Sequence, residues 1–304
     1  MADNSGAAIA PTSIIATLGC GTIGASWATA FLDAGYVVQA WDPSAGALDS
    51  LAQHPRAASA LRRCGSPVEA VTGAAFVQES GPEVLALKQA LLNEIAPGFA
   101  LDAVLASSTS TIPPTALQED CPFADRVLVG HPFNPPHILP LVEVVGGAET
   151  ALATIEAAMR FYLSLGKHPI RLHVERPGHL ANRLQAALWR EAVDAVATGQ
   201  ASVADVEAAV TLALGPRWAL LGPFSTFHLA GGEGGLAHFL DHLGGVFEYL
   251  WDDASRPQLT EELTSQLVRD VQELVGQRPV AELARRRDIA LRRVLEITKG
   301  DSDG

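Results

Sequence analysis

The sequence predicts an α/β fold in which a doubly wound, mostly parallel sheet forms the first domain and an all-α domain follows. Short apolar runs bounded by glycine alternate with helix-like segments over roughly the first 150 residues, which is typical of a parallel sheet covered by helices. Apolar residues then recur every four positions from Leu184 to Val196, as in an amphipathic helix. The change follows a Pro-Gly pair, so we expect two domains, residues 1–176 and 177–304.

Each predicted element has its own local signal. The run IIATL is short, apolar and followed by glycine, which is typical of a buried strand. The next segment has helical spacing and ends at Gly35, and the run YVVQAWD has the pattern of a second strand. In chain order, we expect strands at 14–18, 36–42, 74–80, 103–110, 141–145 and 168–174, helices at 25–35, 83–96 and 150–166, and amphipathic helices near 259–275 and 279–297.

Composition and charge argue against several classes of protein. The 304 residues carry 21 Lys and Arg against 34 Asp and Glu, a net charge of −13. Neither nucleic acid nor an anionic membrane is therefore an expected partner. The start of the chain lacks the pattern of a signal peptide, and no apolar run of about 18 residues occurs. A cytoplasmic enzyme or binding protein is the remaining interpretation.

Cysteine and histidine spacing gives no sign of a metal site. Cys20, Cys64 and Cys121 are widely separated and odd in number, which favours free thiols in a reducing compartment. His238 and His242 are four residues apart and could chelate a metal, but no third ligand accompanies them in a metal-binding spacing. We expect an ordinary helix face there and no bound metal.

A glycine motif lies between the first predicted strand and helix. In G-x-G-x-x-G, the first glycine permits a tight turn, the second lets backbone amides approach a pyrophosphate, and the third lets the helix pack closely. An acidic residue 18 positions later, at the end of the second strand, can accept hydrogen bonds from a ribose diol and repels a 2′-phosphate. This predicts a Rossmann-type site for NAD; the alternative is a glycine turn with a surface aspartate. The residues expected to bind the cofactor are Gly19, Gly21, Thr22, Ile23, Gly24 and Asp42.

A carboxylate interrupts the apolar run LVEVV at 141–145. Side chains alternate along a strand, so Glu143 shares a face with Leu141 and Val145. A carboxylate in a mostly buried strand is costly without a partner. His131, at the head of the preceding proline-rich turn, is the candidate partner, and a His–Glu pair is a general acid/base. The alternative is that Glu143 faces solvent on an edge strand and His131 caps a turn.

Several long motifs in one order carry a resemblance that covers nearly the whole chain. The chain resembles the 3-hydroxyacyl-CoA dehydrogenase superfamily, and within it the L-carnitine dehydrogenase and L-gulonate 3-dehydrogenase (lambda-crystallin) branch. Such a set is far more specific than the glycine motif alone. The motifs are GCGTIGASWA, FVQESGPEVLALKQ, SSTS, GHPFNPPHILPLVEVVGG, RPGHLANRLQAALWREA and RWALLGPFSTFHLAGGEGG.

The resemblance implies an active site and a mechanism. In this family a serine, a histidine, a glutamate and an asparagine act together, and they match Ser110, His131, Glu143 and Asn182. The histidine takes the hydroxyl proton while hydride passes to NAD, the glutamate stabilises the imidazolium, and the other two residues bind or position the substrate. The family also implies a homodimer through the helical domain. The residues implied at the nicotinamide end are Glu83, Lys88, Ser110 and Asn134, with an ordinary exposed helix lysine as the alternative for Lys88.

One segment departs from the family pattern. Only 33 residues separate Asp42 from the strand FVQES, where the acyl-CoA enzymes carry a longer helical insertion that helps to hold CoA. The shortening argues against a CoA thioester and favours a small, free substrate. It also puts one strand of the usual sheet in doubt.

Aromatic and basic residues of the predicted helical domain are candidate substrate contacts. An aromatic cage would suit a quaternary ammonium such as that of carnitine, and an arginine could pair with a substrate carboxylate. Core or dimer contacts are the alternative for each aromatic residue, and arginines can simply bridge helices. The candidates are Trp189, Arg217, Trp218 and Phe224.

Together these features predict an NAD-dependent dehydrogenase of a small 3-hydroxy acid, carnitine- or gulonate-like and not bound to CoA, with His131 and Glu143 as the general acid/base. Three alternatives stay open. The chain could reduce C=N bonds with NAD(P)H, act as a 3-hydroxyacyl-CoA dehydrogenase, or bind NAD without catalysis, as a crystallin does. The intact set of four predicted catalytic residues argues against the last alternative.

Overall fold

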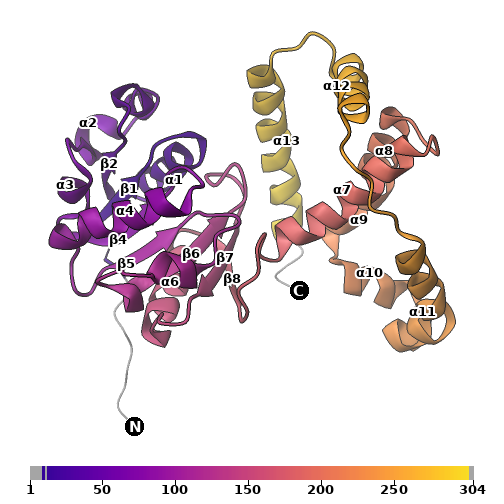
Figure 1. The fold of residues 1–304 in the computed structure, drawn as a ribbon, viewed down its shortest axis with the longest axis horizontal. Helices are drawn as coiled ribbons and strands as arrows, with labels where there is room; N and C mark the ends of the chain where they lie inside the picture. The colour runs from indigo at the N-terminus through magenta and orange to yellow at the C-terminus, as the bar shows by residue number, and fades with distance from the viewer. Residues whose placement is uncertain (1–8, 11, 301–304) are drawn as a thin grey trace. The chain divides into compact units, whose positions relative to one another are not determined.

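The computed structural model describes residues 9–10 and 12–300 of the chain. It divides into two compact units, one ending at Arg183 and the other beginning at Leu184 (Figure 1). This division falls later than the predicted boundary after residue 176. The physical reason is that the backbone of Leu180 and Ala181 is hydrogen-bonded to Glu143 of the sheet.

The first unit is built on one eight-stranded sheet with the order β3-β2-β1-β4-β5-β6-β7-β8. All neighbouring strands are parallel except β6 and β7, which run antiparallel. The predicted doubly wound, mostly parallel sheet is confirmed. The strands are β1 (Ile14–Leu18), β2 (Val37–Trp41), β3 (Leu61–Arg63), β4 (Ala74–Glu79), β5 (Val104–Ser107), β6 (Val127–Pro132), β7 (Leu141–Gly146) and β8 (His168–Leu172).

Two of these strands differ from the sequence expectations. β6 was not expected: His131 lies within this strand and not in the turn that follows it. The strand that the short segment put in doubt is present as β3, which pairs with β2. It follows the four-residue helix α2 (Ala57–Ala60). The shortened segment therefore still forms the edge strand of the sheet, but its helices are short.

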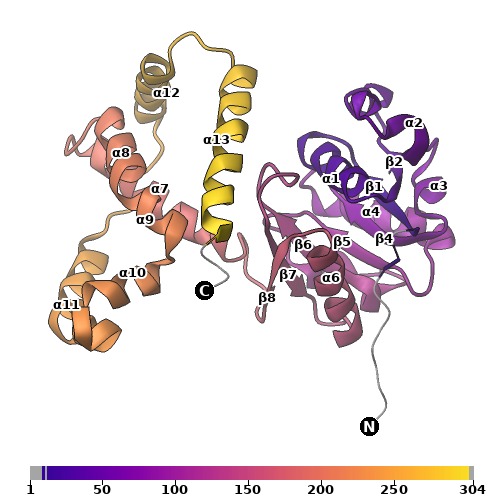
Figure 2. The same ribbon diagram turned by 180° about the vertical axis from the view of Figure 1, so that it is seen from behind.

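Helices cover both faces of the sheet (Figure 2). On one face, α1 (Thr22–Asp33) and α6 (Leu152–Ser164) bury a cluster of aromatic rings, and Phe76 of the sheet stacks on Phe161 with 4.1 Å between ring centroids. On the other face lie α3 (Pro67–Val71), α4 (Leu85–Ile95) and α5 (Pro114–Gln118), with a core of aliphatic residues. Burial of these apolar side chains on both faces is the main term that holds the unit together.

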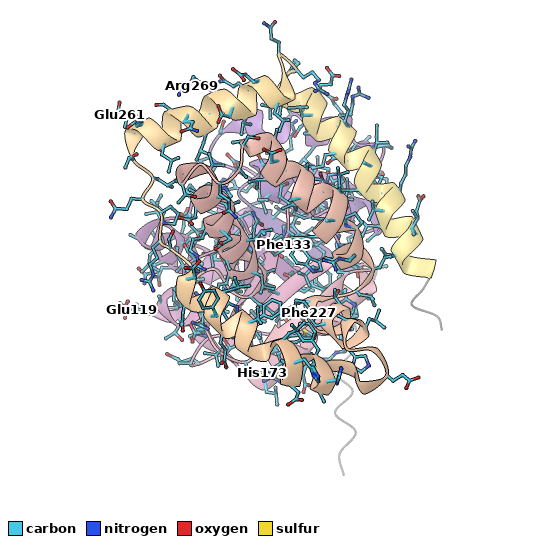
Figure 3. The ribbon with its side chains drawn as sticks, turned by 90° about the vertical axis from the view of Figure 1, so that its right-hand side faces the viewer. Glu119, Phe133, His173, Phe227, Glu261 and Arg269 are labelled. Atoms are coloured by element: carbon cyan, nitrogen blue, oxygen red, sulfur yellow. The ribbon has the colours of Figure 1, made fainter. Side chains whose placement is uncertain are left out.

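Helix α7 (Ala181–Ala197) leads into the second unit, whose described residues form helices and the loops between them. Phe227, labelled in Figure 3, stacks on Phe239 with 4.6 Å between ring centroids and meets Phe247 edge-on at 5.1 Å. None of the described helices is long and apolar enough to cross a membrane. The other α-helices of this unit are α8 (Val203–Ala209), α9 (Gly215–Leu220), α10 (Pro223–Ala230), α11 (Gly235–Asp253), α12 (Glu261–Val275) and α13 (Val280–Gly300).

The topology brings distant parts of the first unit to one edge of the sheet. The carboxyl ends of β1, β2, β4, β5 and β6 meet there because these strands are parallel. The antiparallel β7 begins at the same edge, so its first residues lie opposite the end of β6. The loops that follow the parallel strands and the carboxylate of Glu143 on β7 therefore lie at the same edge of the sheet.

Candidate active site

The glycine turn between β1 and α1 is shaped to receive a phosphate group. Gly19 has φ +82°, and a Cβ there would lie 2.8 Å from the backbone of Ser80 and Gly81. A Cβ on Gly24 would lie 1.8 Å from the carbonyl oxygen of Gly19. At Gly21, in contrast, an added Cβ would meet nothing within 4 Å, and no side chain caps the start of α1. No side-chain cap therefore occupies the first amides of this 12-residue helix, and pyrophosphate binding requires such amides.

A cavity of about 550 Å³ extends from this turn along the edge of the sheet. Asp42 lies in its wall, and its carboxylate accepts hydrogen bonds from the backbone N–H of Cys20 at 2.7 Å and of Ser44 at 2.8 Å. The charged residues of the lining are both carboxylates, which suit a ribose diol and repel a 2′-phosphate. The turn and the cavity therefore fit NAD. The lining residues are Gly19, Gly21, Trp41, Asp42, Pro43, Ser80, Gly81, Pro82, Leu87, Ala90, Leu91 and Glu94.

Substitutions at two glycines should separate cofactor binding from folding. Gly21→Val should weaken NADH binding at least about tenfold, because its side chain would enter the space expected for the pyrophosphate, and leave the unfolding midpoint nearly unchanged. Gly24→Ala should lower the unfolding midpoint, because its Cβ would clash with the backbone at Gly19. Fluorescence titration with NADH and thermal unfolding of both variants test this expectation. Normal NADH affinity in Gly21→Val would contradict the assignment.

His131 and Glu143 form a buried pair across the antiparallel strands β6 and β7. They lie directly opposite each other in the strand register, and His131 Nδ1 is 2.8 Å from Glu143 Oε2. Since a carboxylate only accepts hydrogen bonds, Nδ1 carries the proton and Nε2 of the neutral ring is left with a lone pair. Glu143 is fully buried and His131 is 5% exposed. The expected contact between the two residues is therefore present, and Glu143 does not face solvent.

The start of α7 completes the environment of Glu143. Its second oxygen, Oε1, accepts hydrogen bonds from the backbone N–H of Leu180 at 2.9 Å and of Ala181 at 2.8 Å. Burial alone would raise the pKa of Glu143, but the hydrogen bonds from His131 and from these two amides outweigh it and hold the pKa below its usual value. The carboxylate stays charged, so it can stabilise a positive charge on His131.

Ser110 lies on the loop after β5 and reaches the other side of the His131 ring. Its Oγ is 3.2 Å from His131 Nε2, and its carbonyl oxygen accepts from the backbone N–H of Gly178 at 3.0 Å. One oxygen of Glu83 accepts four hydrogen bonds from this loop: the backbone N–H groups of Ser110 and Thr111 and the hydroxyls of Thr109 and Thr111. Although burial acts to raise it, the bonds from Thr109 and Thr111 lower the pKa of Glu83. Glu83 therefore fixes the loop that carries Ser110.

Three further residues implied by the resemblance lie on different elements around this edge. Asn182 is half-buried in the first turn of α7, directly after Ala181. Asn134 is exposed, in the turn that follows β6. Lys88 is 2% exposed on α4 and its Nζ is bonded to Glu79 Oε1 at 2.8 Å, so the alternative of an ordinary exposed lysine is wrong.

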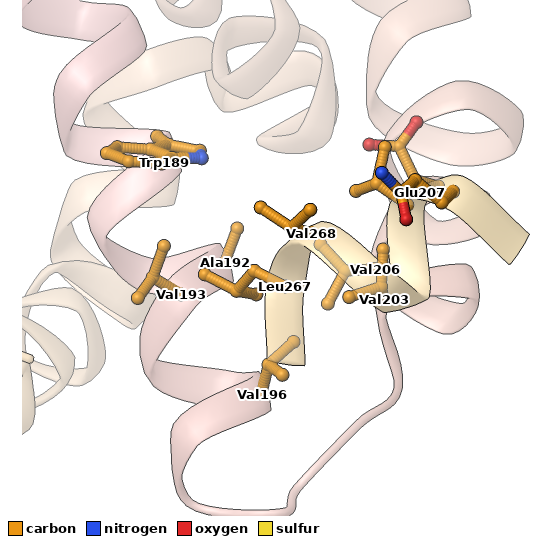
Figure 4. A pocket seen from close by; sticks show the side chains of 11 residues that line it. Trp189, Ala192, Val193, Val196, Val203, Val206, Glu207, Leu267 and Val268 are labelled. Carbon is orange, nitrogen blue, oxygen red and sulfur yellow. The ribbon is translucent and has the colours of Figure 1, made fainter. Parts of the chain in front are cut away.

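The four substrate candidates lie in the second unit. Trp189, on α7, lines an apolar cavity of about 380 Å³ together with residues of α8 and α12 (Figure 4). Arg217 and Trp218 are exposed on α9, and Phe224 is 77% exposed on α10. The structure does not group these four side chains into a cage within that unit. Their role at the substrate stays a prediction.

Some residues around the catalytic pair were not predicted from the sequence. Phe133, which is labelled in Figure 3, packs edge-on against His131 with 5.4 Å between ring centroids. The ring of His179 lies 5.0 Å from that of His131, and Glu79 binds the hydroxyl of Ser107 beneath the serine loop. Glu79 ends strand β4, and a buried carboxylate at a strand end was the one available clue. His179 lies next to the turn at 177–178 and resembles any loop histidine in sequence.

The described residues contain no group of three or more His, Cys, Asp or Glu side chains that could hold a metal. The rings of His238 and His242 lie 4.0 Å apart on α11, and Nδ1 of His242 is 3.0 Å from the carbonyl oxygen of His238. Such an i,i+4 contact to a backbone carbonyl is ordinary for a helix face.

Comparisons with known proteins show the family to which the chain is similar. The profile of the 3-hydroxyacyl-CoA dehydrogenase NAD binding domain matches residues 53–175, and the profile of the C-terminal domain of the same enzymes matches residues 178–268. The chain is 44% identical to L-carnitine dehydrogenase of Streptomyces griseus, with 97% of this chain and 93% of the relative covered. It is 41% identical to L-carnitine dehydrogenase of Pseudomonas aeruginosa, with 92% of each covered.

A solved structure extends the similarity to the fold of nearly the whole chain. That structure is 5-formyl-3-hydroxy-2-methylpyridine 4-carboxylic acid 5-dehydrogenase, described as an NAD+ dependent dismutase. It is 28% identical with a TM-score of 0.80, and the match covers 95% of this chain and 99% of that one.

Proposed function

The chain belongs to the 3-hydroxyacyl-CoA dehydrogenase family and is an NAD-dependent oxidoreductase acting on a secondary alcohol, and from this premise we propose that it oxidises a small, free 3-hydroxy acid such as L-carnitine or L-gulonate. The observation that carries the proposal is the buried His131–Glu143 pair with Ser110 at its Nε2 atom. The relatives named L-carnitine dehydrogenase, at 44% and 41% identity, support the substrate class.

The proposed roles follow from the protonation states. His131 Nε2 carries a lone pair, because Nδ1–H is donated to Glu143, and it takes the proton of the substrate hydroxyl. Bound NAD+ supplies the acceptor for the hydride that leaves the same carbon. Glu143 stabilises the imidazolium that forms, and Ser110 and Asn182 donate hydrogen bonds to the substrate oxygen or position it. We expect the residues of the glycine turn to bind the pyrophosphate and Asp42 to bind the adenosine ribose.

The segment after Asp42 supports a free acid over a CoA thioester. From Pro43 to Val71 the chain forms only short helices and β3, and the longest of these helices, α3, has five residues. The acyl-CoA enzymes that the chain resembles carry a longer helical insertion here. This chain has no helix longer than five residues within the segment to help hold a CoA moiety.

The second unit is proposed to supply the remaining substrate contacts. Trp189, Arg217, Trp218 and Phe224 could recognise the ammonium and carboxylate groups of a carnitine-like acid through cation–π contacts and ion pairs. All four are exposed and so are available to a ligand. Trp189 also packs in its own unit's cavity, which favours a structural contribution from that ring.

A change at Asp42 should relax the choice of cofactor. Asp42→Ala is expected to raise the KM for NAD+ about tenfold, because a charged acceptor for the ribose diol is lost, and to lower the KM for NADP+, because the repulsion of a 2′-phosphate is removed. Initial rates with both cofactors for the wild type and the variant measure this. An unchanged ratio of the two KM values would contradict the role of Asp42.

We also propose that the protein is a cytoplasmic homodimer. The second unit exposes large apolar side chains that a partner subunit could bury. On α11 these exposed side chains are Leu240, Leu243, Val246, Tyr249, Leu250 and Trp251. The three cysteines, all in the first unit, are free thiols, as in a reducing compartment. Light scattering after gel filtration should give about twice the chain mass of 31.9 kDa. A mass of one chain at micromolar concentration would contradict the dimer.

The proposed function is tested by NADH formation with a panel of L-carnitine, L-gulonate, 3-hydroxybutyrate and 3-hydroxybutyryl-CoA, with His131→Gln alongside. Turnover of a free acid that is lost in the variant is the expected result. Turnover of the CoA ester alone would overturn the argument from the shortened segment. If NADH binds but no alcohol reacts, reduction of cyclic imines with NADH or NADPH would identify an imine-reducing enzyme. If no imine is reduced either, a non-catalytic role would be favoured.

A further inference from the structure

His179 is a second imidazole beside the catalytic pair. It lies in the segment from Gly178 to Ala181, which binds the serine loop through Gly178 and Glu143 through its last two amides. The ring is 4% exposed, and its centroid lies 5.0 Å from that of His131. Its Nε2 atom is 2.9 Å from the carbonyl oxygen of Thr109, the residue before Ser110. His179 therefore contacts both the loop that carries Ser110 and the general base.

Two features of His179 are destabilising in themselves. Its backbone has φ +49°, and among the described residues only Asp120 shares this left-handed conformation without being glycine. A carbonyl oxygen only accepts hydrogen bonds, so Nε2 carries the proton and Nδ1 of the neutral ring has a lone pair. That Nδ1 atom is buried and has no hydrogen-bond partner among the described residues. A strained backbone and an unsatisfied buried acceptor at one residue indicate a function beyond packing.

The surroundings of His179 keep its ring neutral. Burial is the largest effect and lowers its pKa; the bond to Thr109 raises it, and a charge on His131 lowers it further. The carboxylates of Glu143 and Glu83 act in the opposite direction but are outweighed. A charged His179 would place two positive rings 5.0 Å apart when His131 holds a proton. The neutral ring avoids this repulsion.

We propose that His179 is a positioning residue for the acid–base pair: its hydrogen bond to Thr109 holds the Ser110 hydroxyl against Nε2 of His131, and its neutral ring leaves the positive charge of the reaction on His131 alone. This rests on the proposed function, because it assumes that His131 is the general base. His179 itself touches neither substrate nor cofactor in this role. It acts through Thr109 and through the electrostatics of the His131 ring.

Two variants isolate the hydrogen bond from the shape of the side chain. His179→Gln keeps an N–H donor that can reach the Thr109 carbonyl, whereas His179→Phe keeps a ring and loses the donor. Both carry the same positive-φ backbone, so the strain is matched. With L-carnitine and saturating NAD+, we expect kcat to fall about tenfold to a hundredfold in the Phe variant and only a few-fold in the Gln variant. KM for NAD+ should stay within about twofold in both, because neither variant alters the residues expected to hold the cofactor.

A spectroscopic measurement tests the same inference without turnover. In protein labelled with ¹⁵N-histidine, long-range ¹H–¹⁵N correlations should show one ring that stays a neutral Nε2–H tautomer to below pH 6.5 and is absent from His179→Gln. Equal loss of kcat in both variants would overturn the proposal, as would unchanged kcat in the Phe variant. It would also be overturned if the ring assigned to His179 became protonated near pH 6.5. If no free hydroxy acid reacts with the wild type, the proposed function fails, and the spectrum still decides the state of His179.

Discussion

Replacing Glu143 by glutamine should lower kcat by about 10³- to 10⁴-fold at neutral pH, although the two side chains have nearly the same shape. In the wild type, Oε1 accepts from the Leu180 and Ala181 amides and Oε2 accepts from His131 Nδ1. The glutamine has one oxygen, which must stay with the two amides. Its NH₂ group then faces Nδ1, so His131 must accept there and carry its proton on Nε2. In that tautomer His131 cannot take the substrate proton.

The measurement is steady-state NADH formation with the free acid identified in the substrate panel, together with NADH titration. NADH affinity should be unchanged, because Glu143 lies outside the cofactor cavity. Glu156→Gln on α6, an exposed position in the same unit, is the matched control and should retain wild-type kcat. If Glu143→Gln kept kcat within tenfold of the wild type, the tautomer argument and the acid–base role of the pair would both be wrong.

The sequence predicts the catalytic pair because strand alternation and the energetics of burial act locally. A carboxylate in LVEVV needs a partner, and His131, at the head of the preceding turn, was the candidate base. The register that places it directly opposite Glu143 depends on β6 running antiparallel to β7. That pairing is a tertiary feature, and β6 itself was hidden because the prolines after His131 gave the stronger signal of a turn.

The fold class follows from periodicity, whereas the contacts around the site do not. Alternating apolar strands and helices predict the covered parallel sheet, and the glycine spacing predicts the open turn at Gly21. His179 and Glu83 contact the same serine loop but lie almost 100 residues apart in the chain. Each contact depends on a loop conformation set by tertiary packing, and a single sequence carries no periodic signal for it.

The buried partner of Lys88 also could not be predicted from the sequence, because the sequence around Lys88 is that of an ordinary amphipathic helix. In the structure its ammonium lies 2.8 and 2.9 Å from the two oxygens of Glu79, which is fully buried. Lys88 Nζ also lies 3.2 Å from the carbonyl oxygen of Gly81, and the N–H of Gly81 donates to Glu79 at 2.6 Å. The ion pair therefore fixes the loop from Ser80 to Pro82, which forms part of the cofactor cavity.

Lys88→Met should consequently lower the free energy of unfolding by about 3–5 kcal/mol, because it leaves Glu79 as a buried charge with no cation beside it. The double variant Lys88→Met with Glu79→Gln should recover much of that loss, since an uncharged pair pays a smaller desolvation cost. Arg171→Met, at an exposed position on β8, is the matched control and should change stability by less than about 1 kcal/mol.

Denaturant unfolding of the four proteins gives these differences, and NADH titration gives their effect on the cofactor cavity. The single Lys88 variant should bind NADH more weakly than the wild type, because the Ser80–Pro82 loop loses its anchor. If the double variant were as unstable as Lys88→Met, the loss would come from removing the lysine stem and its packing, not from the stranded charge. If it were stable and still bound NADH weakly, the weak binding would come from the lost contacts of Lys88 and not from lost stability.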